Sequence, residues 1–313
     1  MTRTLLTGLL VTTTLAGCRP ARLATTPAPE RADPSLQAEL ESLVGGFKGE
    51  VGLYVRHLRT GQTAGINADS VFPTQSVVKV PILVGTFDAI HRGVLDYRTR
   101  LVYTDSLLYR GVDIIGGLKD SATIALGQVA MLMITTSDNT GSLWLQHLAG
   151  TGTTINAWMA AHGFEHTRVN SRTPGREANQ KLYGWGQTTP REMSRLMLMI
   201  RDGKAVSQAA SEEMYRALTR VYWNGAALAA IPPWVQVASK QGWVRGARSE
   251  TAVVNAPSGD YVFTVSIWKA ADEGLGTDSE PGILMQQISA LLWRYFEPQY
   301  PWRPDPDATK YKP

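Results

Sequence analysis

Apolar residues follow two different periods along this chain, and the changes of period divide it into segments. Near the N-terminal side, LQAELESLV within 35–45 has the three-to-four-residue spacing of an amphipathic helix. GEVGLYVRHL and GQTAGINAD then have strand character, with an R-T-G-Q turn between them. The pattern therefore predicts a helix followed by a β-hairpin.

The middle of the chain has the helical period almost throughout. Helices are expected over 76–91, 123–133, 140–148, 153–162, 190–202 and 207–218. Strand character returns in VQVASK at 235–240, TAVVNA at 251–256 and YVFTVSIW at 261–268, and a last amphipathic helix is expected over 282–296.

Strands at both ends with helices between them predict an α+β fold, in which the two chain ends form one sheet. The expected sheet part is 34–70 with 225–300, the expected helical part is 71–224, and 301–313 is a tail. A pocket is expected at the seam between the two parts, because small-molecule sites usually lie at such seams.

The N-terminal eighteen residues, MTRTLLTGLLVTTTLAGC, indicate an export signal over 1–17 followed by Cys18, the only cysteine. The stretch is short and polar for a membrane span, which needs about 20 apolar residues. LAGC resembles the lipobox of bacterial lipoproteins, which implies that Cys18 is the lipidated first residue of the mature protein. The alternative is a cleaved secretory signal whose cysteine has no role. RPARLATTPAPERAD at 19–33 has the composition of a flexible linker.

Composition and charge exclude some function classes. The 313 residues are 43% hydrophobic and 19% charged, as in ordinary soluble proteins. The net charge of +4 would become 30 − 27 = +3 after cleavage before Cys18, too small and too scattered for nucleic-acid binding. HGFEH at 162–166 has the letters of a zinc motif, but Gly163 should end the helix that such a motif needs. We expect a monomer without metal or cofactor.

Three short motifs carry the candidate chemistry. In TQSVVKVPIL, Ser76 and Lys79 lie one helical turn apart, as a nucleophile and its base would. The second motif is S-D-N at 137–139, and the third is SKQGWV, with Lys240 at the end of a strand and Gly242 two residues later. Each motif alone has an ordinary explanation: a helix cap with a snorkelling lysine, a turn, or a strand glycine. For Gly242, a ligand that approaches closely is the preferred explanation.

In this order the motifs resemble those of the penicillin-recognising serine enzymes, S-x-x-K, S-D-N and K-T-G, and most closely the class A β-lactamases, over about residues 35–300. The resemblance implies an antiparallel sheet packed with helices beside a helical subdomain. It also implies site roles: Ser76 as acylated nucleophile, Lys79 as its proton partner, Ser137 as proton donor to the leaving nitrogen, Asn139 on the substrate amide, Lys240 on the substrate carboxylate, and the backbone N–H groups of Ser76 and Trp243 around the oxyanion.

Two positions depart from the family pattern. Gln241 replaces the usual threonine, so an amide stands where a hydroxyl would hold the substrate carboxylate. In the loop TRVNSRTPGREANQKLYGWGQTTP, 167–190, Thr173 falls where class A enzymes have the glutamate that activates water. Glu177 replaces it only if the backbone bulges at Gly175. The alternative is a surface carboxylate paired with Arg176 or Arg172.

Several residues are candidates for the walls of the site. Tyr109 is expected on the helical side, and Tyr222 or Trp223 and Trp234 in a groove or in the core. Arg245 and Arg248, just past the K-x-G strand, either bind a carboxylate or face solvent.

Three functions remain open. The first interpretation is a hydrolase that opens the β-lactam amide through a Ser76 acyl-enzyme. The alternatives are a D-Ala-D-Ala peptidase or penicillin-binding protein that acts on peptidoglycan stem peptides, and a penicillin-binding sensor that is acylated without release. Each suits an exported protein that is lipid-anchored to a membrane of the cell envelope.

Overall fold

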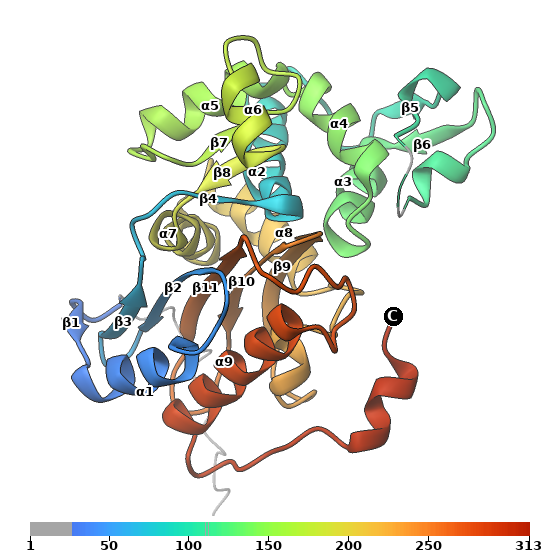
Figure 1. The fold of residues 1–313 in the computed structure, drawn as a ribbon. Helices are drawn as coiled ribbons and strands as arrows, with labels where there is room; N and C mark the ends of the chain where they lie inside the picture. Colours follow the sequence, from blue (N-terminus) through green and yellow to red (C-terminus); the bar gives the residue numbers. More distant parts are fainter. Residues whose placement is uncertain (1–26, 110, 112) are drawn as a thin grey trace, which may run out of the picture.

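A computed structural model describes residues 27–313 except Arg110 and Val112. The expected signal peptide and Cys18 lie outside the described residues. Six strands form the main sheet, in the order β1-β3-β2-β11-β10-β9 (Figure 1). Their bounds are β1 Arg31–Ala32, β2 Glu50–His57, β3 Gln62–Ile66, β9 Val237–Val244, β10 Ala247–Val254 and β11 Tyr261–Trp268. The two chain ends thus meet in one sheet, as the sequence predicts.

The strands of the sheet are antiparallel except for β1, which runs parallel to β3. The expected hairpin is β2 and β3, and the α+β prediction is confirmed. Two details were wrong. Strand β9 continues to Val244, so Lys240 lies inside the strand rather than at its end, because the residues after it still pair with β10. The flexible linker expected over 19–33 ends earlier than expected, since Arg31 and Ala32 already pair with β3.

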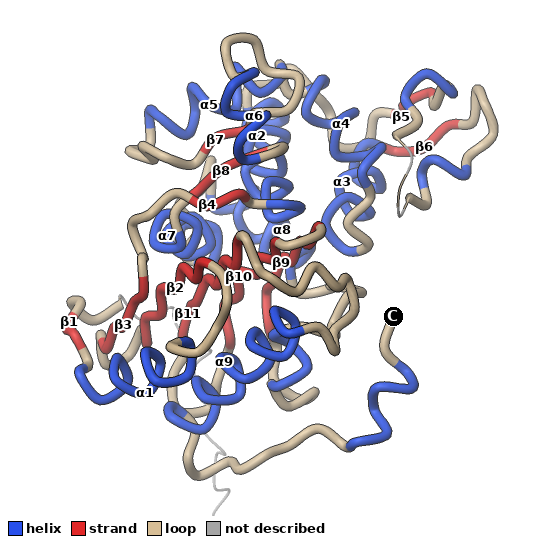
Figure 2. The backbone as a smooth tube through the Cα atoms, in the orientation of Figure 1, coloured by secondary structure: helices blue, strands red, loops and turns tan. Residues whose placement is uncertain are grey.

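Helices cover both faces of the sheet. Helices α1 (Pro34–Val44) and α9 (Glu280–Phe296) lie on one face, and α7 (Pro190–Arg201) lies on the other (Figures 1 and 2). The apolar side chains of α1, α9 and strands β2, β10 and β11 form one buried core. A second core lies between α7 and the helical part of the chain. The site described below lies where the sheet meets that helical part.

The helical part surrounds α2, whose residues are almost all buried. Its elements are α2 Lys79–His91, α3 Leu126–Thr135, α4 Asn139–Leu148, α5 Thr151–Ala161, α6 Glu177–Tyr183 and α8 Gln208–Leu218. Short strands complete it: β4 Phe72–Pro73, β7 Arg168–Val169 and β8 Gly186–Thr188 form one small sheet, and β5 Arg100–Val102 and β6 Thr123–Ala125 form another.

The helix expected over 123–133 begins later than expected. Residues 123–125 pair with β5 as strand β6, and the helix α3 starts at Leu126. Its first turn is closed by the Gln128 side chain, whose Oε1 accepts a hydrogen bond from the backbone nitrogen of Ala125 at 3.0 Å. The helix α5 ends at Ala161 and Gly163 takes a left-handed φ of +73°, as expected for the HGFEH segment.

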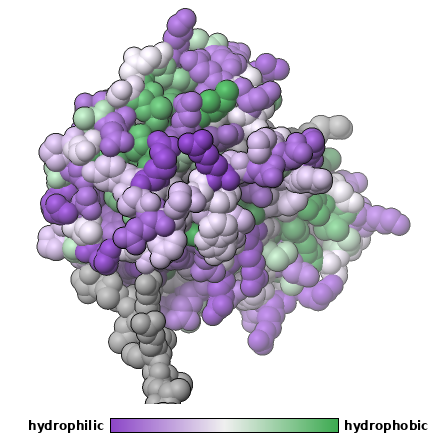
Figure 3. All heavy atoms as spheres, turned by 90° about the horizontal axis from the view of Figure 1, so that it is seen from below, coloured by the Kyte–Doolittle hydropathy of each residue, from purple (hydrophilic) through white to green (hydrophobic). Residues whose placement is uncertain are grey.

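The outer surface carries both hydrophilic and apolar residues. Seen from below, it is largely hydrophilic with local apolar patches (Figure 3). Among the described residues, no helix has the length and apolar character needed to cross a membrane.

Candidate active site

Ser76 and Lys79 lie at the start of the central buried helix. A 3₁₀ turn, Gln75–Val78, leads directly into α2, which begins at Lys79. One helical turn separates the two side chains, so that the Lys79 Nζ lies 3.2 Å from the Ser76 Oγ. Gln75, just before the serine, has a left-handed φ of +46°, which is uncommon for a residue with a side chain. The serine is therefore presented on a tight, strained turn.

The segment that precedes α4 supplies the next two members of the site. The Lys79 Nζ donates to the Ser137 carbonyl oxygen at 2.5 Å and to the Asn139 Oδ1 at 2.8 Å, and it lies 3.1 Å from the Ser137 Oγ. Ser137 also has a left-handed φ, +63°. Ser76, Ser137 and Asn139 thus surround the Lys79 amine, and the last two are distant from it in the sequence.

Lys240 completes the hydrogen-bond chain from the sheet side. Its Nζ lies 3.1 Å from the Ser137 Oγ and 2.5 Å from the Gln241 carbonyl oxygen. The Ser137 hydroxyl therefore lies between the nitrogen atoms of Lys79 and Lys240. The resulting chain runs Ser76, Lys79, Ser137, Lys240, and we call it the catalytic chain below. A hydroxyl held between two amines can pass a proton in either direction.

Burial sets the protonation of these amines. Lys79 is 0% exposed, and desolvation lowers its pKa to about 7, although Asp138 and Asp113 oppose the change. Desolvation and the neighbouring Lys79 lower the pKa of Lys240 well below its ordinary value. Glu250, buried on β10 opposite Gln241, has its pKa raised to about 7 by desolvation. A lysine that is partly neutral near pH 7 can accept a proton from serine.

Two carboxylates hold the S-D-N segment in place. The Asp138 Oδ2 accepts from the backbone nitrogens of Ile114 and Ile115 at 2.7 and 2.8 Å. Asp113 accepts from the backbone nitrogen of Asn139 at 2.5 Å and from the Thr140 Oγ1 at 2.7 Å. The Asp138 Oδ1 also accepts from the Gly141 backbone nitrogen at 2.7 Å, so both acids bind the N-terminal end of α4, where negative charge is favourable. Sequence reasoning missed Asp113, since a single aspartate in a glycine-rich loop gives no signal.

Glycine is needed at position 242 for a different reason from the expected close approach of a ligand. A Cβ at this position would collide with the Ser76 backbone nitrogen and lie 3.0 Å from its Cα. The strand β9 therefore needs glycine to pass the Ser76 backbone, and a ligand is not required to explain it. Trp243, the next residue, lines the groove beside Ser76.

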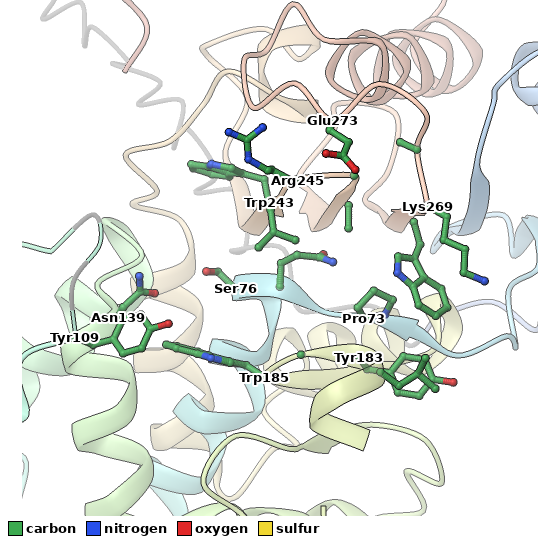
Figure 4. Close-up of a pocket in the computed structure, with 18 residues that line it drawn as sticks. Pro73, Ser76, Tyr109, Asn139, Tyr183, Trp185, Trp243, Arg245, Lys269 and Glu273 are labelled. Atoms are coloured by element: carbon green, nitrogen blue, oxygen red, sulfur yellow. The ribbon is translucent and has the colours of Figure 1, made fainter. Parts of the chain in front are cut away.

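A groove of about 440 Å³ opens over Ser76. Figure 4 shows Ser76 facing Asn139, Tyr109 and Trp185 on one side and Trp243 on the other. Tyr109 lines it as expected, and its ring meets Trp185 edge to face at a centroid distance of 4.9 Å. Sequence reasoning missed Trp185. Tyr183, Trp268, Lys269 and Glu273 also line the groove, and Arg245 lies beside Trp243 (Figure 4).

The 167–190 loop does not bring Glu177 to this groove. Glu177 is exposed at the first turn of α6, and its Oε1 accepts from the backbone nitrogen of Gly175 at 3.1 Å. Thr173 is buried, and its Oγ1 donates to the Ser171 carbonyl oxygen at 2.9 Å. Among the described lining residues the only carboxylate is Glu273, on the far wall.

The 167–190 loop is held together by hydrogen bonds to the uncharged side-chain oxygens of Asn170 and Gln187. The Arg176 guanidinium donates to the Asn170 Oδ1 at 2.8 and 3.0 Å and to the Gln187 Oε1 at 2.7 Å. The Asn179 Nδ2 also donates to the Gln187 Oε1, at 2.9 Å. The expected pairing of Arg176 with Glu177 is therefore absent from this network, and Arg176 instead ties the start of the loop to its end.

A second pocket, of about 640 Å³, shares Trp243 with the groove. Gln241, Arg248 and Trp223 line it. Arg248 does not face solvent: it is 4% exposed, and its Nη2 donates to the Gly276 carbonyl oxygen at 2.6 Å and the Ser279 Oγ at 2.9 Å. The buried Arg248 Nε and Gln241 Nε2 have no hydrogen-bond partner among the described residues. Arg245, in contrast, is exposed on the turn between β9 and β10.

The remaining aromatic candidates lie outside the groove. Trp223 packs edge to face on Trp243 at 5.4 Å, and its Nε1 donates to the Thr136 carbonyl oxygen at 2.7 Å. Tyr222 is exposed, and Trp234 lines a separate surface pocket.

The sequence as a whole matches a known family over residues 35–296, which is described as "Beta-lactamase enzyme family". The chain belongs to the β-lactamase enzyme family. Its relatives include β-lactamase VEB-1 from Pseudomonas aeruginosa, 22% identical over 277 residues that cover 84% of this chain and 90% of VEB-1. AER-1 from Aeromonas hydrophila is 25% identical over 223 residues, which are 70% of this chain and 73% of AER-1.

Solved structures of two kinds share the fold. PBP-A has a TM-score of 0.78 and 27% identity, covering 87% of this chain and all 100% of PBP-A. A class A β-lactamase from Mycobacterium abscessus has a TM-score of 0.74 and 21% identity, covering 83% of this chain and 99% of the β-lactamase. The family membership makes the chain a serine hydrolase of the β-lactamase kind, with the penicillin-recognising fold expected from its motifs.

Proposed function

We propose that the protein is an acyl-serine enzyme whose Ser76 opens the ring of β-lactams and cleaves peptides that end in D-Ala-D-Ala. Its acyl-enzyme is hydrolysed slowly. The catalytic chain carries this proposal: it links a serine to two buried lysines and contains no carboxylate. Acylation needs a base near the serine, and Lys79 supplies it. Hydrolysis needs a second base near the ester, and the described groove offers none beside Ser76.

Acylation proceeds in two proton transfers. Neutral Lys79 takes the proton of the Ser76 hydroxyl while the Ser76 Oγ bonds to the substrate carbonyl carbon. The carbon–nitrogen bond then breaks, Ser137 gives its proton to the leaving nitrogen, and protonated Lys79 restores the proton of Ser137 over 3.1 Å. For a β-lactam the leaving nitrogen stays attached through the opened ring, and for the peptide it departs as D-alanine.

The substrate carboxylate is held from the sheet side. Lys240, the Gln241 amide and the buried Arg248 all lie on strands β9 and β10 at that side of Ser137. Asn139 lines the groove on the opposite side, where the acyl part of the substrate would lie against Tyr109 and Trp185. The backbone N–H groups of Ser76 and Trp243 would stabilise the oxyanion, as the family resemblance implies.

Slow hydrolysis follows from the loop. Thr173 cannot act as a base near neutral pH, and Glu177 is turned to the Gly175 backbone outside the groove. The likeness to PBP-A supports this part of the proposal, because a mutant of PBP-A was solved as an acyl-enzyme complex with penicillin G. We expect the peptidase or penicillin-binding activity to exceed β-lactam turnover.

The test is intact-mass spectrometry of the protein mixed with benzylpenicillin, followed over time beside a Ser76→Ala control. A persistent adduct on the wild type alone supports the proposal. An adduct that disappears quickly as penicilloate accumulates would show a β-lactamase with rapid turnover and would overturn the slow hydrolysis. An absence of adduct would overturn Ser76 as a penicillin-reactive nucleophile.

The peptide substrate has its own test. A D-Ala-D-Ala peptide should release D-alanine in the presence of the wild type and not of Ser76→Ala. A persistent penicillin adduct without any D-alanine release would instead favour a sensor that is acylated without turnover.

We also propose export and lipidation at Cys18, on the LAGC segment of the sequence. The expected result is a membrane-bound protein that detergent extracts and that carries the added mass of acyl chains at its N-terminus. Cys18→Ser should abolish that mass, and an unmodified Cys18 in the wild type would refute the lipid anchor.

A further inference from the structure

The second pocket has one wall from a segment that is distant in sequence. Thr309 and Pro313 line it together with Gln241, Trp243 and Arg248. The segment 301–313, which we call the tail strap, follows α9 and runs back along the molecule to the side of β9 (Figure 1). The sequence suggested only an appendage outside the catalytic domain, so its presence at this pocket is a finding of the tertiary structure.

The tail strap is attached weakly. Trp302 packs edge to face on Trp234 at a centroid distance of 6.3 Å, and most other strap residues are exposed, with Tyr311 at 87%. Its hydrogen bonds are internal, such as the one from the Thr309 Oγ1 to the Pro306 carbonyl oxygen at 3.2 Å. Within the described chain, no hydrogen bond joins 301–313 to another segment. Few buried contacts and no external hydrogen bonds are typical of segments that open locally at low cost.

The pocket lies on the leaving side of the catalytic centre. Trp223, one of its walls, donates its Nε1 proton to the Thr136 carbonyl oxygen, directly before Ser137. Ser137 is the residue that protonates the leaving nitrogen in the proposed function. The groove that holds Tyr109 and Trp185 lies on the other side of Trp243. The part of a substrate attached to the leaving nitrogen therefore extends toward the tail strap.

We propose that the tail strap is a specificity element that limits the size of the leaving side of the substrate. This inference rests on the proposed function of Ser76. A small leaving side ends near Gln241 and Arg248, on the strand wall of the pocket, and leaves the strap in place. A bulky leaving side shares its space with Thr309 and Pro313 and is accommodated only when the strap is displaced. The rate for bulky substrates is then reduced by the fraction of molecules in which the strap is open.

The test compares two β-lactams that differ on the leaving side. Nitrocefin carries a large aromatic substituent there, whereas benzylpenicillin carries a small ring with two methyl groups. Second-order acylation rates are measured for the full chain, for a chain ending at Tyr300, and for Trp302→Ala. If the strap is closed in about nine molecules of ten, both variants should raise the nitrocefin rate about ten-fold and change the benzylpenicillin rate less than about two-fold.

The chain ending at Tyr300 keeps the Trp293 Nε1 hydrogen bond to the Tyr300 carbonyl oxygen, 2.9 Å, which closes the end of α9. Trp302→Ala tests the same idea if the shorter chain fails to fold. Tyr311→Ala is the matched control, because that side chain is exposed and lines neither pocket. An unchanged or lowered nitrocefin to benzylpenicillin ratio would overturn the inference, as would an equal rise for both. If neither compound acylates the full chain, the proposed function itself fails.

Discussion

The catalytic chain and the 167–190 loop belong to the same site, yet they differ in chemistry. The catalytic chain is largely buried and basic, and two lysines share the hydroxyl of Ser137. The loop contributes Trp185 to the groove and is closed on itself through neutral Asn170 and Gln187. Under the proposed function, the difference means that acylation and hydrolysis depend on separate parts of the fold. The proposal therefore expects the groups for acylation to be present and a base for hydrolysis to be missing.

The largest effect is expected from removing the amine at the centre of the catalytic chain. Lys79→Met keeps most of the buried stem and removes the base, so acylation by benzylpenicillin should fall by about 10²–10⁴-fold. The measurement is the initial rate of adduct formation by intact mass. Lys204→Met, at an exposed lysine between α7 and α8, is the matched control and should keep the wild-type rate. A small loss at Lys79 would assign the base to another group.

A base restored to the loop should reverse the contrast between the two regions. Thr173→Glu places a carboxylate where the family has one, and the lifetime of the benzylpenicillin adduct should shorten by about 10–100-fold. The lifetime is measured by adduct decay after dilution. Thr173→Gln, equal in size but unable to act as a base, should leave the lifetime long. Equal lifetimes in the two variants would show that this position does not face the ester.

The acidity of Lys79 predicts a pH dependence for acylation alone. Because desolvation lowers the pKa of Lys79 to about 7, its neutral form increases about ten-fold per pH unit below 7 and predominates above it. The acylation rate should rise about ten-fold per pH unit below 7 and level off above it. The profile is measured between about pH 5 and 9 on adduct formation. A rate that continues to rise to pH 9 would mean that the lysine keeps a higher pKa than its burial implies.

The smallest effect is expected at Glu177. Its carboxylate binds the Gly175 backbone nitrogen at an exposed position, so Glu177→Gln should change the adduct lifetime by less than about two-fold. The measurement is the same adduct decay. A lifetime lengthened many-fold would show that the loop bulges in the acyl-enzyme and brings Glu177 to the ester as its base.

Much of the fold follows from local pattern. The hairpin of β2 and β3, the three C-terminal strands and most helices lie within a few residues of their predicted ranges, because period and turn residues are local signals. The short strands β4, β7 and β8 gave no such signal, since two or three residues have no period. The same is true of the start of α3, where pairing with β5 overrides helical spacing.

The amino-acid sequence by itself determined the α+β class, the family and the identities of the chemical groups at Ser76, Lys79, Ser137 and Lys240. Only the tertiary structure decided what surrounds them: that Gly242 clears the Ser76 backbone, that Arg248 is buried, and that Glu177 faces away. It also placed the tail strap beside the pocket that Gln241 and Arg248 line. The physical reason is that spacing along a helix or strand fixes neighbours within that element, whereas burial, pKa and pocket walls depend on segments that meet only when the chain folds.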